Sequence, residues 1–101
     1  MDLTQLGEEI EQISQIYADK FGIERDGDWF LLKLQEEVGE LTQAYLMASG
    51  RARDKGHSAD ELRERLHAET ADVLCHVLLL ARHHGVDLEA AIDKKWLSWH
   101  R

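Results

Sequence analysis

The sequence predicts an all-α protein, a small bundle of four helices. Apolar residues recur three and four positions apart along most of the chain, which is the spacing of one face of a helix. No stretch of useful length alternates apolar and polar residues as a strand would, and the chain contains no proline. The length of 101 residues suits one domain, so we expect residues 1–101 to form a single domain.

Capping residues place the first two helices. Asp2 or Thr4 would cap a helix that runs to about Lys20, because a short polar side chain at this position can accept a hydrogen bond from the first turn. The segment FGIERDGD is then typical of a turn. Asp28 would cap a second helix over about 29–49.

The second half of the chain contains similar signals. Ser58 followed by Glu61 is a capping-box pattern and would open a third helix that ends near 84–85. Residues 50–57, GRARDKGH, would form the connecting loop, whose basic residues we interpret as a solvated charge run. Asp87 would cap a fourth helix that runs to the C-terminus.

Composition narrows the classes of function. The net charge of -8 argues against a protein that grips nucleic acid through a general basic surface. It allows a small phosphorylated ligand, because acidic side chains can reach phosphates through a divalent cation. The longest apolar run, VLCHVLLLA, is too short to span a membrane, and the N-terminus lacks the pattern of a signal peptide. The single cysteine, Cys75, excludes an internal disulfide and a Cys-rich zinc site. We expect a cytoplasmic protein with no membrane partner.

Two short acidic motifs lie on the second and third predicted helices. EEVGE contains Glu36, Glu37 and Glu40, and ETAD contains Glu69 and Asp72. The apolar seam of the second helix would consist of Leu31, Leu34, Val38, Leu41, Tyr45 and Ala48. The seam of the third would consist of Leu62, Leu66, Val73, Val77 and Leu80.

These acids would converge on one edge of the helix pair. At roughly 100° per residue, Glu37 and Glu40 lie about 70° and 130° from their seam, and Glu69 and Asp72 lie about 50° and 110° from theirs in the same rotational direction. Consecutive helices joined by a short loop pack antiparallel, which brings equal offsets to the same side of the pair. Glu36 points nearly opposite the seam.

Four converging carboxylates require a counter-charge. Like charges about 4 Å apart repel by about 4 kcal/mol at an effective dielectric of 20. Oxygen-only ligands suit a hard cation, so the cluster predicts a site for Mg²⁺, with Mn²⁺ as an alternative. A di-iron centre is disfavoured because neither acidic motif continues as Glu-x-x-His: Glu37 is followed three residues later by Glu40, and Glu69 by Asp72.

The ordered pair EEVGE and ETAD resembles the EExxE…ExxD motif of the MazG-like, all-α nucleoside triphosphate pyrophosphohydrolases, and the similarity extends from about Trp29 over most of the chain. The resemblance implies hydrolysis of a nucleoside triphosphate, including a modified or deoxy nucleotide, to the monophosphate and pyrophosphate. It implies that Glu37, Glu40, Glu69 and Asp72 ligate Mg²⁺. Glu36 would orient or deprotonate the attacking water.

Substrate contacts are expected from a smaller group of basic and aromatic residues. Lys33 lies beside the acids and could pair with them or reach a phosphate. Lys95 fits a lysine position of the family, whereas Trp99 stands where the family has asparagine, followed by His100 and Arg101. The candidate substrate-binding residues are Lys33, Lys95, Arg101, Trp29 and Trp99. For Trp96 we favour a position in the core, and for His76 a position at its edge.

The third predicted helix is apolar around more than half of its circumference near 73–81. A small bundle alone would leave part of that apolar surface exposed to water. We therefore expect a homodimer or a dimer of dimers, whose subunits contact one another around Leu74, Leu78 and Ala81. Pairing of the helices across a dimer is also what the family resemblance implies.

Two alternative functions stay open on the sequence. One is the related phosphoribosyl-ATP pyrophosphohydrolase of histidine biosynthesis, which shares the acidic motif. The other is a non-catalytic helical module that uses the acids for stability or for metal-dependent assembly.

Overall fold

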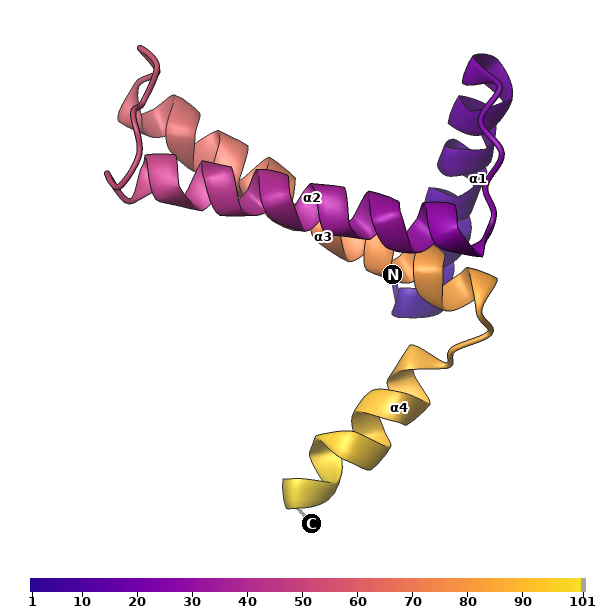
Figure 1. The fold of residues 1–101 in the computed structure, drawn as a ribbon. Helices are drawn as coiled ribbons and strands as arrows, with labels where there is room; N and C mark the ends of the chain where they lie inside the picture. Colours follow the sequence, from indigo (N-terminus) through magenta and orange to yellow (C-terminus); the bar gives the residue numbers. More distant parts are fainter. Residues whose placement is uncertain (101) are drawn as a thin grey trace.

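The chain folds into four α-helices and a short 3₁₀ helix, as the computed structural model of residues 1–100 shows (Figure 1). The helices are α1 (Leu3–Phe21), α2 (Gly27–Ala48), α3 (Ala59–His83) and α4 (Leu88–Lys95), followed by η1 (Leu97–His100). No strand occurs within residues 1–100. The all-α prediction is confirmed. No helix in this range is long and apolar enough to cross a membrane.

Side-chain caps define most of the helix starts. Asp2 caps α1 through the backbone N–H of Gln5, and Ser58 and Glu61 form the predicted capping box of α3. Asp87 accepts a hydrogen bond from the backbone N–H of Ala90 at the start of α4. These features satisfy N–H groups that the first turn of a helix leaves without partners.

Two predicted helix ends are wrong. Asp26 caps α2, because its Oδ1 accepts a hydrogen bond from the backbone N–H of Trp29 at 2.8 Å, and Asp28 lies inside the first turn. The fourth helix does not run to the C-terminus as one α-helix. It ends at Lys95, and the chain continues as η1.

Helices α2 and α3 pack antiparallel along their length and form a hairpin (Figure 1). Helix α1 crosses the hairpin at the end where α2 begins and α3 finishes, and α4 leaves that end in another direction. The guanidinium of Arg25 fixes the connection between α1 and α2. Its two terminal nitrogens each donate to one carboxylate oxygen of Glu11 at 2.8 Å, and Nη1 also donates to Ser14 Oγ.

The apolar seam of α2 is rotated from the predicted one. The residues of α2 that are buried in this chain are Phe30, Glu37, Ala44 and Met47. Leu31, Val38 and Tyr45, which were expected in the seam, are exposed. The acids Glu37 and Glu40 consequently lie nearer to α3 than the sequence predicted.

The apolar flank of α3 is already partly covered by the chain itself. Leu78 and Ala81 are buried and face the N-terminal turns of α1, and Leu74 is exposed. The predicted subunit contact around these three residues is therefore wrong for Leu78 and Ala81. Trp96 is also exposed, which contradicts its expected place in the core.

Candidate active site

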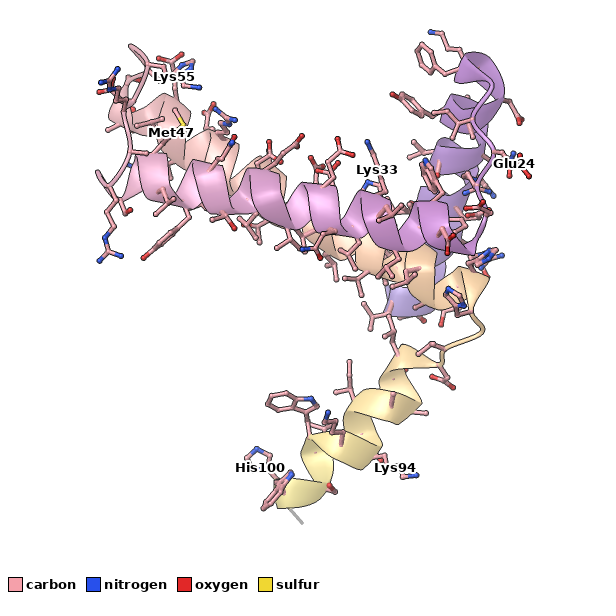
Figure 2. The ribbon with its side chains drawn as sticks, in the orientation of Figure 1. Glu24, Lys33, Met47, Lys55, Lys94 and His100 are labelled. Carbon is pink, nitrogen blue, oxygen red and sulfur yellow. The ribbon has the colours of Figure 1, made fainter. Side chains whose placement is uncertain are left out.

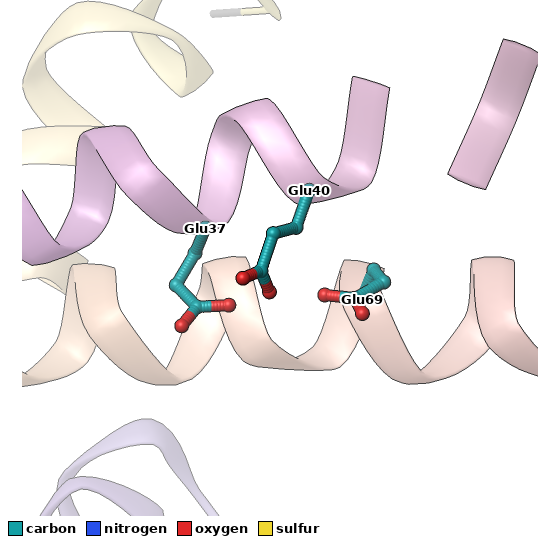
Figure 3. Close-up of side chains that lie close together, drawn as sticks. All are labelled: Glu37, Glu40 and Glu69. Carbon is teal, nitrogen blue, oxygen red and sulfur yellow. The ribbon is translucent and has the colours of Figure 1, made fainter. Parts of the chain in front are cut away.

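Three glutamates converge between α2 and α3. Glu37 and Glu40, one turn apart on α2, point towards Glu69 on α3 (Figure 3). One carboxylate oxygen from each residue lies within 4.8 Å of the other two. The prediction that the two acidic motifs would meet on one side of an antiparallel pair agrees with this geometry for these three residues.

Two carboxylate oxygens of this cluster lack hydrogen-bond partners. Glu37 is 7% exposed, and the Oε2 atoms of Glu37 and Glu69 are buried without a hydrogen-bond partner. Burial raises the pKa of Glu37 and of Glu69, and the neighbouring charge of Glu40 raises the pKa of both further. Buried anionic oxygens without donors call for a proton or a cation.

Asp72 lies next to the cluster. It is exposed and does not belong to the group of three close oxygens, but it lines a cavity together with Glu37. Its negative charge is also among the causes that raise the pKa of Glu37 and of Glu69. The structure thus brings three of the four predicted ligands together and places the fourth at their edge.

Glu36 does not belong to the group of three close oxygens. Its side chain is largely exposed, and Lys33 Nζ lies 3.5 Å from its Oε2. Glu36 Oε2 thus lies beside the Lys33 ammonium group.

A cavity of about 380 Å³ opens beside the cluster. From α2 and α3, its lining includes Trp29, Lys33, Glu37, Asp72 and His76. Its other wall comes from α1, through Ile10, Ile13, Ser14 and Tyr17. No role for α1 at the site was predicted from the sequence, and the signal that could have indicated one is the apolar face that carries Ile10, Ile13 and Tyr17.

His76 is an additional polar group at this cavity. Its Nε2 lies 3.8 Å from Glu37 Oε1, and its Nδ1 is buried without a hydrogen-bond partner. Its ring also meets Trp29 edge-on. Burial lowers the pKa of His76, because removal from water disfavours the imidazolium. The predicted position at the edge of the core is close to the observed one.

The remaining candidates lie away from the cluster in this chain. Lys95 belongs to α4 and Trp99 to η1, and both elements extend away from the α2–α3 hairpin (Figure 2). Trp99 is 87% exposed. Arg101 lies outside the described residues. The basic loop 50–57 is exposed at the far end of the hairpin.

The donor atoms suit a hard divalent cation. All three close ligands offer carboxylate oxygen, two of their oxygens have no other partner, and like charges within 4.8 Å favour an ion that neutralises them. Sulfur and imidazole ligands, which would favour zinc or copper, do not contribute to this group of three. The residues present therefore fit Mg²⁺ or Mn²⁺.

The fold and the site together define an all-α protein with a carboxylate centre able to bind a metal ion between two antiparallel helices. The family model for phosphoribosyl-ATP pyrophosphohydrolase matches residues 5–94, and the chain belongs to this family. The family is part of the MazG-like all-α nucleoside triphosphate pyrophosphohydrolase superfamily, so the predicted superfamily is confirmed. Membership supports pyrophosphohydrolase activity on a nucleotide. No solved structure matches the chain.

Proposed function

We propose that this protein hydrolyses a nucleoside triphosphate of the cytoplasmic pool to its monophosphate and pyrophosphate, with Mg²⁺ as the cofactor. The observation that carries the proposal is the crowding of Glu37, Glu40 and Glu69, whose buried oxygens lack partners, in a chain of a pyrophosphohydrolase family. Such a cluster is costly as a structural element and useful as a cation site.

In the proposal, the acids divide into ligands and a base. Glu37, Glu40 and Glu69 hold the ion, and Asp72, at the edge of the cavity, completes the set. A bound Mg²⁺ would neutralise phosphate charge and lower the pKa of a coordinated water. Glu36, which does not contact the three close oxygens, accepts the proton of the attacking water.

The bond changes follow from these roles. The water oxygen forms a bond to the α-phosphorus, and the bond between that phosphorus and the α–β bridging oxygen breaks. The electron pair leaves with pyrophosphate, and the proton of the water passes to Glu36. Lys33, held 3.5 Å from Glu36, is close enough to the same edge to contact a phosphate of the substrate.

The cavity beside the cluster would take the nucleoside part of the substrate. Its volume of about 380 Å³ falls in the range of small-ligand sites. Trp29 and Tyr17 provide aromatic surfaces on two sides, and aromatic side chains stack with any base. The cavity shares Glu37 with the acidic cluster, so the base and the phosphates of one nucleotide can occupy adjoining spaces. Lys95 and Trp99 have no role in a site formed by one chain, because α4 and η1 extend away from the hairpin.

Phosphoribosyl-ATP is the second candidate substrate, and the family whose model matches the chain favours it. The same cleavage between the α and β phosphates would apply to it. The two candidates differ in the group attached to the base and not in the reaction.

Assay of purified protein against the common nucleoside triphosphates, deoxy and modified nucleotides and phosphoribosyl-ATP, with Mg²⁺ or Mn²⁺, tests the proposal. We expect monophosphate and pyrophosphate in equal amounts, with no release of inorganic phosphate. Turnover confined to phosphoribosyl-ATP would select the second candidate. Absence of turnover on every substrate, with subunits that associate only when metal is present, would select the non-catalytic module instead.

A further inference from the structure

His76 is a polar side chain beside the acidic cluster that the proposed reaction does not use. It lies on α3 one turn after Asp72, on the wall of the cavity that also includes Glu37. Its side chain is only 17% exposed. Polar contacts are stronger in such surroundings than in water, and a polar group left without a partner there is costly.

The two oxygens of the Glu37 carboxylate have different surroundings. Oε1 lies 3.8 Å from His76 Nε2, whereas Oε2 is buried without a hydrogen-bond partner. Lys33, a donor on the same wall of the cavity, already bonds to Glu36. The arrangement therefore turns Oε1 towards the imidazole and leaves Oε2 available to a cation.

The surroundings of the two ring nitrogens favour one tautomer of His76. A neutral imidazole carries a single N–H, on either Nδ1 or Nε2. Nδ1 is buried without a hydrogen-bond partner, so a proton placed there would be a buried donor with no acceptor. A proton on Nε2 faces the anionic oxygen of Glu37. The tautomer with the proton on Nε2 is therefore the more stable one.

Packing against Trp29 holds the ring of His76 in this direction. The two rings meet edge-on at an interplanar angle of 61°, with their centroids 6.4 Å apart. The distance of 3.8 Å between Nε2 and Oε1 is longer than a hydrogen bond. Rotation about the last side-chain bond of Glu37, whose torsional preference is weak, shortens it while the imidazole stays in place.

His76 lies outside the group of three close oxygens, which come from Glu37, Glu40 and Glu69. It contacts one member of that group and so is placed to support a ligand without being one. Carboxylates that bind a metal ion are commonly hydrogen-bonded by a further group, which fixes the direction of the ligand oxygen.

We infer that His76 is a positioning residue, whose Nε2–H donates to Glu37 Oε1 and thereby directs Glu37 Oε2 to the metal ion. Loss of a support of this kind typically weakens metal binding by about 10 to 100-fold. The inference rests on the metal site of the proposed function and not on the identity of the substrate.

Binding of Mn²⁺ without substrate, followed by electron paramagnetic resonance, tests this role. His76→Leu is expected to bind Mn²⁺ about 10 to 100-fold more weakly than the unmodified protein. His76→Gln should recover most of that loss, because its amide N–H reaches the place of Nε2, whereas His76→Asn carries its N–H nearer to Nδ1 and should not.

His83→Leu is the matched control for packing. His83 lies on α3 two turns after His76, and its ring packs against Phe30 with the centroids 4.5 Å apart. His83 does not belong to the acidic cluster or line the cavity beside it. The control variant is therefore expected to bind Mn²⁺ as tightly as the unmodified protein.

Nitrogen NMR of the unmodified, metal-free protein tests the tautomer without depending on how a variant folds. The protein is labelled at histidine and measured at about pH 8, well above the ordinary pKa of the imidazole. The signals missing from the spectrum of His76→Gln identify those of His76. We expect them to show the proton on Nε2.

Each outcome decides the inference. Unchanged Mn²⁺ affinity in His76→Leu, or a proton on Nδ1 in the NMR spectrum, would overturn it. A lower metal-free Tm with unchanged affinity would make His76 a packing residue. Nitrogen hyperfine coupling from an imidazole bound to Mn²⁺ would make it a ligand. These results would leave the proposed function standing, whereas an unmodified protein that binds no Mn²⁺ would overturn the metal site and this inference together.

Discussion

Replacing Glu40 with glutamine is expected to stabilise the metal-free protein and to destroy its activity. Glu40 is the common neighbour in the cluster, because its charge raises the pKa of both Glu37 and Glu69. Glutamine keeps the size of the side chain, removes one negative charge and adds an N–H donor. The two partnerless oxygens nearby belong to Glu37 and Glu69, so that donor has acceptors within reach.

The magnitude follows from the separation of the oxygens. At 4.8 Å, two unit charges repel by about 3 kcal/mol at an effective dielectric of 20 and by about 1 kcal/mol in water. Glu40 is partly exposed, so we take the lower value as the expected gain. A gain of about 1 kcal/mol raises Tm by about 4 to 8 °C in a protein of this size.

Thermal unfolding with a chelator present measures this gain, and the same experiment with Mg²⁺ measures binding. Mg²⁺ should raise the Tm of the unmodified protein by mass action and raise that of Glu40→Gln much less. Turnover of the variant should fall by at least about 100-fold. Glu36→Gln is the matched control, since it makes the same chemical change on an exposed neighbour and should leave the metal-free Tm nearly unchanged. A lower metal-free Tm for Glu40→Gln would show that the cluster stabilises the fold without an ion.

Further predictions concern the base, the α1–α2 connection and a helix cap. Glu36→Gln should lower kcat by about 10² to 10⁴-fold while KM and the Mg²⁺ midpoint of activity stay close to those of the unmodified protein, and a shifted midpoint would make Glu36 a ligand. The hydrogen bonds from Arg25 hold the pKa of Glu11 below its ordinary value of 4.5, so this pair stabilises the fold above that pH and the stabilisation is lost as the pH falls through the lowered pKa. Glu11→Gln should therefore cost about 1 to 2 kcal/mol in urea unfolding at pH 7 and progressively less in acid, and an equal loss at pH 3 would contradict this origin. Asp26→Ala should cost about 1 kcal/mol and Asp28→Ala much less, because Asp26 caps α2; equal losses would contradict that assignment.

Local signals in the sequence predicted the helices well. The capping box of Ser58 and Glu61 and the cap at Asp87 identified two helix starts, because each depends on hydrogen bonds within one turn. The cap of α2 was assigned wrongly to Asp28, and Asp26 is the cap in the structure. Both residues can cap a helix, and the one that does so depends on how Arg25 fixes the preceding chain against α1.

The direction of the α2 seam was predicted less well, because α2 has apolar residues in two directions. Phe30, Ala44 and Met47 are buried, whereas Leu31 and Tyr45 are exposed on another side of the helix. The apolar spacing of the whole helix points in the average of these two directions, which lies between them. The burial of Glu37 could not emerge from such an average, since a glutamate counts as polar wherever it lies.

The parts of the site that come from distant segments could not be derived from spacing. The wall of the cavity that α1 supplies depends on how α1 crosses the hairpin, and this crossing is fixed by contacts such as that of Arg25 with Glu11. The separation of Trp99 from the acids depends on the direction in which α4 leaves α3. Neither angle is encoded in the pattern of a single helix.

The hairpin of α2 and α3 has a consequence for the order in which the chain acquires its structure. These two helices make the most extensive contact in the molecule, and only residues 49–58 separate them in sequence. Contacts between segments that are close in sequence form quickly, since little chain entropy is lost in closing a short loop. Helix α1 is synthesised before α2 and α3, yet its docking surface on α3 is completed only when His83 has been added. Helix α1 is therefore expected to dock after the hairpin forms, and its apolar residues stay exposed until then.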